Sequence, residues 1–214
     1  MIKYKIIFKK RKNISILLDK DGNIIINAPK NISKKYIDNF VQSNKKWIEN
    51  NKKVIQQIPK NKTTFLYLGE EIKLLISNED FKNIKFNGIN FYISRKNKDN
   101  SKELLHKFYI DQADKIIKKR IIFYTKKYNF KINKIKISNA NTRWGSCGAQ
   151  NNININWKLI MADKKIIDYV IIHELAHTIE HNHSKNFWVI IENIMPDYKE
   201  RKDWLRKNGN LLYI

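Results

Sequence analysis

The sequence predicts an α+β protein in which a strand-rich N-terminal part precedes a part dominated by long helices. The first third of the chain alternates short apolar stretches with turn residues, as strands do. Residues 104–124 repeat apolar side chains at the helical period, and residues 166–179 are apolar on nearly every side, as in a buried helix. A chain of 214 residues with 42% hydrophobic content is long enough to bury such a core.

Short strands are expected throughout the N-terminal part. Each is a short run rich in isoleucine, leucine or aromatic residues and bounded by turn-forming or charged residues. Asn87-Gly88 suits the tight primed turn of a hairpin that follows them. The expected strands are residues 4–8, 14–18, 24–27, 65–68 and 72–76, with a turn at residues 19–22.

A single helix is expected between the third and fourth strands. Ser33 can cap its N-terminus, and the helical pattern continues to about Gln57. Five apolar residues fall on one face at helical spacing, which indicates a buried face. They are Ile37, Phe40, Val41, Trp47 and Ile48.

Residues 95–101 are polar and charged, without an apolar side chain, and are the expected domain boundary. The prediction is a strand-rich region with one helix at residues 1–95 and a second domain at residues 96–214. The second domain is expected to open with a long helix that ends near Tyr128.

Two strands are expected after this helix, at residues 135–138 and 152–157, on either side of a turn-rich segment at residues 139–150. In the second strand, isoleucines alternate with asparagines, so the two residue types lie on opposite faces. The asparagine face is therefore expected to meet water or a bound partner.

The buried helix carries the motif H-E-x-x-H in His173, Glu174 and His177. Two histidines four residues apart lie one helical turn apart, so both imidazoles can bind one metal ion. Glu174 is placed beside such an ion and can accept a proton from zinc-activated water, which then attacks a peptide carbonyl. Ionisable groups in apolar surroundings need partners or a metal. The motif therefore predicts a zinc-dependent metallopeptidase with Glu174 as general base.

A catalytic zinc ion usually has three protein ligands, so one more donor is needed. His181 would lie about 12 Å along the helix from His173 if the helix continued, too far to share one ion. His183 is favoured, because Asn182 tolerates the conformation that ends helices and Ser184 can cap the next helix. The carboxylate of Glu192 is the alternative ligand.

A long run of residues around this motif resembles the YgjP-like metallopeptidase family, which is related to the SprT-like zinc proteases. The resemblance implies a zincin-like catalytic domain at residues 96–214, with Zn²⁺ held by His173, His177 and His183, and Glu174 as catalytic base. Family members often have proline where this chain has His181. The similar segments are T-R-W-G-S-C at residues 142–147, the strand at residues 152–157, the motif helix, N-H-S at residues 182–184, and M-P-D-Y at residues 195–198.

Four further residues are candidates for roles at the site. Arg143 can stabilise an oxyanion, but a structural ion pair is the favoured interpretation. Cys147 can approach the metal as an inhibitory ligand, but the favoured interpretation is that it is a small buried residue. Tyr169 and Tyr198 can donate to an oxyanion, although tyrosines on apolar helices more often belong to the core.

The formal net charge of +23 and the pI near 9.9 favour encounter with anionic partners. A peptide or protein substrate is expected, a nucleic-acid partner is compatible with the charge, and the oligomeric state is left open. The lysines are spread along the chain, which favours a compositional origin of the charge. The alternative functions are a zinc-stabilised nucleic-acid-binding module with a closed metal shell, and a SprT-like protease recruited to DNA.

A cytoplasmic location without membrane association is expected. Charged residues interrupt residues 1–10, and no stretch approaches the ~18 apolar residues of a membrane span. Cys147 is the only cysteine, which excludes an internal disulfide and is consistent with a reducing compartment.

Overall fold

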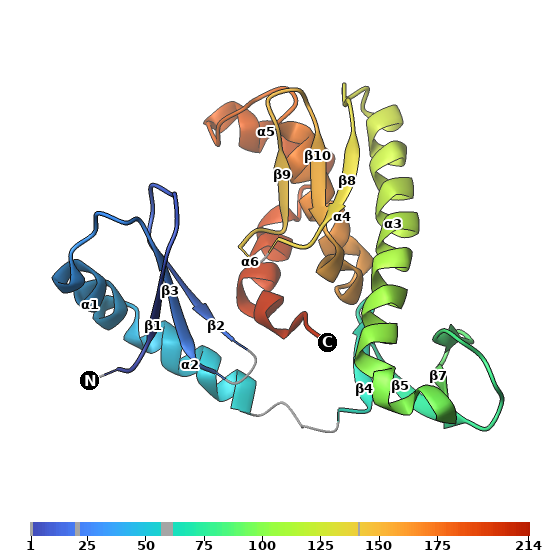
Figure 1. The fold of residues 1–214 in the computed structure, drawn as a ribbon. Helices are drawn as coiled ribbons and strands as arrows, with labels where there is room; N and C mark the ends of the chain where they lie inside the picture. Colours follow the sequence, from blue (N-terminus) through green and yellow to red (C-terminus); the bar gives the residue numbers. More distant parts are fainter. Residues whose placement is uncertain (1, 20–21, 57–61, 141) are drawn as a thin grey trace. The chain divides into compact units, whose positions relative to one another are not determined.

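The computed structural model describes residues 2–19, 22–56, 62–140 and 142–214 and confirms the α+β class (Figure 1). The chain forms two compact units, Met1–Lys62 and Thr63–Ile214. No helix within these described ranges has the length and apolar character needed to cross a membrane.

The N-terminal unit is a three-stranded sheet with two helices. Strand β3 (Ile24–Ala28) is central, parallel to β1 (Lys5–Phe8) and antiparallel to β2 (Ser15–Leu18). Isoleucines of β3 pack against the apolar face of the helices, as the alternating pattern predicts. The buried core of this unit is Ile24, Ile26, Ala28, Ile37, Val41 and Ile48.

The single helix expected in this unit is two helices, α1 (Lys34–Ser43) and α2 (Lys45–Gln56). Asn44 separates them, and its side chain donates to the carbonyl of Phe40 at 2.8 Å, a local bond that competes with helix continuation. The predicted cap is confirmed, since the Ser33 side chain accepts from the N–H of Tyr36.

Other details of this unit differ from the prediction or cannot be compared with it. Trp47, expected on the buried face, is 46% exposed. The expected helix end at Gln57 and the middle of the turn at residues 19–22 lie outside the described residues.

The second unit begins with a four-stranded sheet in the order β4-β5-β7-β6. Strand β5 is antiparallel to β4 and parallel to β7, and β6 is antiparallel to β7. The strands are β4 (Thr64–Tyr67), β5 (Glu70–Ser77), β6 (Lys85–Phe86) and β7 (Phe91–Ser94). The loop between β6 and β7 is longer than the expected two-residue turn, because the Asn87 side chain accepts from the N–H groups of Ile89 and Asn90.

The structure places the division between units at residues 62–63, not at residue 95. Phe91 and Ile93 of the sheet share one buried core with Leu105 of α3 (Ser101–Lys127). The hydroxyl of Tyr109 on α3 donates to the carbonyl of Leu66 at 2.7 Å. The polar stretch is a surface 3₁₀ helix (Arg95–Asn100) that leads into α3, so its composition reflects exposure.

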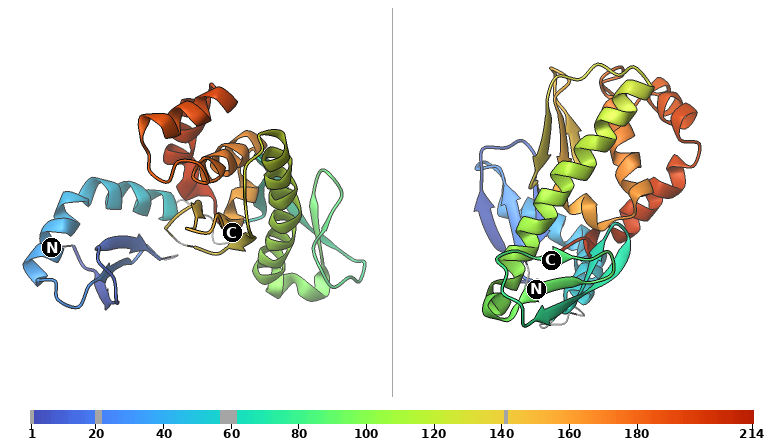
Figure 2. Two further views of the ribbon diagram at one scale, coloured as in Figure 1. Left: turned by 90° about the horizontal axis from the view of Figure 1, so that it is seen from above. Right: turned by 90° about the vertical axis from the view of Figure 1, so that its right-hand side faces the viewer.

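Around the long helix α3 lie a second sheet and the remaining helices. In Figures 1 and 2, α3 runs beside both β8 and α4, and both contacts are present in the structure. The sheet order is β8-β10-β9, with β10 parallel to β8 and antiparallel to β9. The elements are β8 (Ile135–Ser138), β9 (Gly145–Cys147), β10 (Ile153–Asn156), the 3₁₀ helix Trp157–Met161, α4 (Lys164–Ala176), α5 (Lys185–Ile194), α6 (Tyr198–Asn208) and the 3₁₀ helix Gly209–Leu211.

The asparagine face of β10 contacts the protein itself, which differs from the expected water or bound partner. Asn156 is 2% exposed, and its side chain donates to the carbonyls of Ala140 and Arg143 at 2.6 and 3.1 Å. The Asn154 side chain donates to the Ser146 hydroxyl at 3.3 Å. These side chains hold the segment that contains β9, a strand within the stretch expected to be turns.

A buried ion pair joins α4 to α3. The Arg120 guanidinium on α3 donates through two nitrogens to the carboxylate of Asp168, whose side chain is 9% exposed. Tyr124 lies beside Arg120 and accepts from it at 3.4 Å. Because a buried carboxylate without a partner is costly, this pair helps to hold α4 against α3.

We therefore expect Arg120→Met to lower the free energy of unfolding by about 3 kcal/mol, because Asp168 would stay buried without a partner. Lys118→Met is the matched control on the same helix, since its pair with Asp114 is exposed and should contribute under about 0.5 kcal/mol. Urea denaturation followed by circular dichroism measures both variants. Equal losses would contradict the special role of the buried pair.

Candidate metal centre

Helix α4 carries three of the predicted site residues at its C-terminal end. It begins at Lys164, and the side chain of the preceding Asp163 caps it by accepting from the N–H of Lys165 at 2.8 Å. Its apolar residues are buried on several sides, as the sequence predicts. The helix ends at Ala176, with His177 as the C-cap residue, so His173 and His177 lie on successive turns.

The early end of α4 brings His183 back to this pair. The helical pattern reaches Ile179 in the sequence, but Ile179 lies beyond the helix and is 62% exposed. Ser184 caps α5 by accepting from the N–H of Phe187 at 3.3 Å. The chain therefore turns between the two helices, and His183 lies within this turn.

The three histidines converge on one point. The Nε2 atoms of His173 and His183 are 3.1 Å apart, and one ligand atom from each of the three imidazoles lies within 4.8 Å of the others. Two nitrogens bound to a tetrahedral zinc ion at its usual distance are separated by about 3.3 Å. The donor set and its spacing therefore fit a metal ion such as zinc.

The neighbours of His177 set its tautomer and orientation. Its Nδ1 atom lies 3.1 Å from the carbonyl oxygen of Glu180, and because a carbonyl only accepts, Nδ1 carries the proton. Nε2 is then the nitrogen with a free lone pair, the arrangement common in metal-binding histidines. The ring also stacks on Phe187, with the ring centroids 4.4 Å apart.

Phe187 is the shared support of the three imidazoles. It is fully buried on α5, and its ring centroid lies 4.4–4.9 Å from those of His173, His177 and His183. From the sequence, Phe187 was predicted only as part of the helix that follows Ser184. The available signal was its place three residues after the capping Ser184.

The protonation state of His173 also suits metal binding. Burial lowers its pKa to about 3, with further lowering by His177, His183 and Lys202. The pKa of His183 is lowered as well, by burial, His177 and Lys202. Neutral imidazoles have lone pairs available to a cation.

Glu174 lies next to the convergent histidines in a buried position. The residue is 6% exposed, and burial raises the pKa of its carboxyl group to about 7. The backbone N–H of Cys147, which donates to the carboxylate, and the charge of Arg143 oppose this shift. A carboxylate with a pKa near neutrality is suited to exchanging protons at physiological pH.

Gly145 on β9 leaves the space that the Glu174 carboxylate occupies. A Cβ atom at this position would lie 2.5 Å from Oε1 of Glu174 and 2.8 Å from its Cδ. Gly145 was not predicted as a site residue, although it lies within the segment T-R-W-G-S-C that resembles the family. Its role depends on the packing of β9 against α4, which one sequence does not reveal.

The alternative ligands lie outside the convergent group. Within the described residues, only the three histidines form a cluster of possible metal donors, so Cys147 and Glu192 are not part of one. Glu192 instead lies 3.6 Å from Lys199 at the surface. His181 is exposed in the turn. Burial and the nearby Glu174 raise the pKa of the Cys147 thiol.

Arg143 does not form, with any described residue, the structural ion pair that was the favoured prediction for it. It is exposed, and among the described residues no carboxylate lies within ion-pair distance of its guanidinium, although its charge acts on Glu174.

The two candidate tyrosines are both buried. Tyr169 is 5% exposed, and its ring centroid lies 6.0 Å from that of His173. Tyr198 is 6% exposed and stacks on Trp188. Both tyrosines thus belong to the packing around the centre.

Comparison with known protein families identifies the chain as a metallopeptidase. The chain belongs to the YgjP-like family, because the model of the YgjP-like metallopeptidase domain matches residues 12–208. The resemblance expected from the sequence is confirmed. No curated protein matches the chain.

Two solved structures show limited similarity to the chain. One is the metallopeptidase zymogen of Pyrococcus abyssi abylysin, with 21% identity and a TM-score of 0.40 over 44% of this chain and 94% of the other. The second is the metallopeptidase zymogen of Methanocaldococcus jannaschii jannalysin, with 21% identity and a TM-score of 0.37 over 42% and 94%.

We expect Gly145→Ala to reduce kcat/KM for peptide hydrolysis at least about tenfold, because the new methyl group displaces the Glu174 carboxylate. The three histidines lie elsewhere, so the metal content should stay unchanged. Gly148→Ala is the control, since its Cβ would meet nothing closer than 3.8 Å. Full activity in Gly145→Ala would contradict the proposed fit between β9 and the carboxylate.

Proposed function

We propose that the protein is a zinc-dependent metallopeptidase in which His173, His177 and His183 hold Zn²⁺ and Glu174 is the general base. The observation that carries the proposal is the convergence of three imidazoles beside one buried carboxylate. Within the described residues no fourth donor joins them. An open position of this kind is typical of catalytic zinc sites, whereas structural sites are closed by four protein ligands.

Each residue has a separate task in peptide hydrolysis. Zinc, when bound, acts as a Lewis acid that polarises the peptide carbonyl and lowers the pKa of water. Glu174 accepts the proton of the attacking water and passes it to the leaving amine, a transfer suited to its raised pKa. The exposed Arg143, whose charge acts on Glu174, is available to stabilise the negative charge that forms on the carbonyl oxygen.

Strand β9 is the proposed binding edge for an extended peptide. It lies at the end of the sheet order β8-β10-β9, so one of its sides is not paired with a strand of this sheet. It also contacts α4, and the Cys147 N–H reaches Glu174. Main-chain hydrogen bonds to such an edge give affinity with little dependence on sequence. The proposed substrates are therefore peptides or proteins, and the single cysteine supports a reducing, cytoplasmic compartment.

We expect Glu174→Gln to retain zinc and to lose hydrolysis by at least about a hundredfold, because glutamine cannot accept the proton. Zinc content by atomic emission and casein cleavage measure the two properties on the same samples. A zinc-loaded Glu174→Gln protein that still cleaves casein would contradict the assignment of the base.

Two further variants test whether His183 is the third zinc ligand. His183→Ala should lose bound zinc, whereas His181→Ala, which changes an exposed histidine two residues away, should keep zinc and activity. Retention of zinc at full affinity in His183→Ala would indicate another ligand.

A second candidate function is nucleic-acid binding by the N-terminal unit. Residues 1–62 hold 16 lysines and arginines but four acidic residues, a formal net charge of +12, or about half of the total. Three aromatic side chains of this unit are 46–55% exposed, and each follows or precedes two lysines. These are Phe8 with Lys9 and Lys10, Tyr36 with Lys34 and Lys35, and Trp47 with Lys45 and Lys46.

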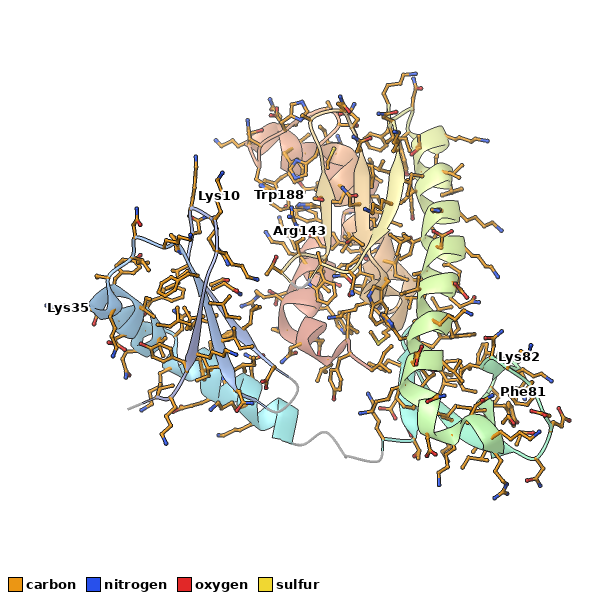
Figure 3. The ribbon with its side chains drawn as sticks, viewed as in Figure 1. Lys10, Lys35, Phe81, Lys82, Arg143 and Trp188 are labelled. Carbon is orange, nitrogen blue, oxygen red and sulfur yellow. The ribbon has the colours of Figure 1, made fainter. Side chains whose placement is uncertain are left out.

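Exposed aromatic rings beside lysines are suited to single-stranded nucleic acid, which stacks its bases on rings and places phosphates near cations. Lys10 and Lys35 both extend outward from this unit (Figure 3). A metallopeptidase recruited to DNA would combine this function with the first.

We expect the full chain to bind a fluorescent single-stranded oligonucleotide with an affinity that falls steeply as salt increases, because counterions are released. Replacing Lys45 and Lys46 by alanine should weaken binding several-fold and reduce the salt dependence. Replacing the exposed Lys126 and Lys127 of α3 removes the same charge and serves as control. Equal weakening by both double variants would indicate attraction to net charge alone and would exclude a specific role of Lys45 and Lys46 beside Trp47.

A further inference from the structure

A cleft of about 390 Å³ opens between α5 and α6 beside the candidate metal centre. Trp188 forms its wall on α5, and charged residues of α6 form much of the rest. In the view of Figure 3, Trp188 and Arg143 both lie on the side of β9 away from α3. The lining residues are Trp188, Tyr198, Lys199, Lys202, Asp203 and Arg206.

Trp188 connects this cleft to the histidines. Its ring stacks on His183 with the centroids 5.8 Å apart, and on Tyr198 with the centroids 5.4 Å apart. The same ring lies 6.0 Å from that of His173. A peptide held at the histidines can therefore place a neighbouring side chain or its end in the cleft.

Lys202 is the cation of this cleft that lacks a carboxylate partner among the described residues. Its ammonium group lies 4.1 Å from the centre of the Trp188 ring. The other charges are paired. Lys199 lies 3.6 Å from Glu192, and Asp203 is bound by Arg206 and Lys207 at 2.8 and 3.1 Å.

An ammonium group on an aromatic face, next to an apolar wall, is a site for a carboxylate that has a short methylene stem. The stem would contact Trp188 and Tyr198, and the carboxylate would pair with Lys202.

We propose that this cleft is a substrate subsite that binds a carboxylate of the peptide, with Lys202 as the specificity-determining residue. The inference rests on the proposed peptidase function, since it names the class of peptide that the same site prefers. The carboxylate belongs either to an aspartate or glutamate side chain or to the C-terminus of the peptide.

Calorimetric binding to the zinc-loaded, full-length Glu174→Gln protein tests the subsite without turnover. The ligands are blocked hexapeptides of alanine and glutamine in which each position in turn carries glutamate. One further peptide has all glutamines and a free C-terminus. We expect one glutamate position, or the free C-terminus, to increase affinity about fivefold over the blocked all-glutamine peptide, and this gain to shrink with added salt.

Lys202→Met in the same background should abolish the gain, because methionine keeps an apolar stem on Trp188 but carries no charge. Lys164→Met is the matched control, since it removes the same charge from an exposed position on the neighbouring helix α4, outside the cleft lining. The glutamate peptides and the free C-terminus separate the two sources of the carboxylate.

Three results would overturn the inference. They are equal affinities for all peptides, a gain that survives Lys202→Met, and no binding of any peptide. Hydrolysis by the wild type is measured separately. An active enzyme without a carboxylate preference defeats the subsite alone, whereas a preference in a protein that cleaves nothing defeats the peptidase proposal alone.

Discussion

Helix α4 is apolar on most of its sides, so it is stable only where other elements surround it. The long helix α3, strands β9 and β10, and helices α5 and α6 all contact it. The ion pair between Arg120 and Asp168 satisfies a carboxylate that this burial would otherwise leave without a partner. The arrangement of the second unit follows largely from the need to cover this one helix.

The same burial determines the chemistry of the site. An apolar environment disfavours charge, which keeps His173 neutral and raises the pKa of Glu174. Burying these two polar groups without partners costs free energy, and the proposed cation and its substrate would supply those partners. The enclosure that stabilises the helix therefore also suits its ionisable residues to the proposed metal binding and proton transfer.

The sequence predicted the parts of the molecule that depend on local patterns. The helix with the motif, the capping Ser184 and the return of His183 all follow from periodicity and turn residues. Features that depend on packing between distant segments were missed. Strand β9 is short and forms only by pairing with β10, and a polar stretch near residue 95 proved to be a surface helix rather than a boundary.

Phe187 connects the candidate metal centre to helix α5 through packing contacts. Its ring contacts all three imidazoles, yet it belongs to α5 rather than to α4. With the proposed ligands, docking of α5 and binding of the ion would therefore be linked equilibria, in which each favours the other. Loss of that ion would weaken the support that α5 receives through Phe187, so the local order of this helix would respond to the supply of the metal.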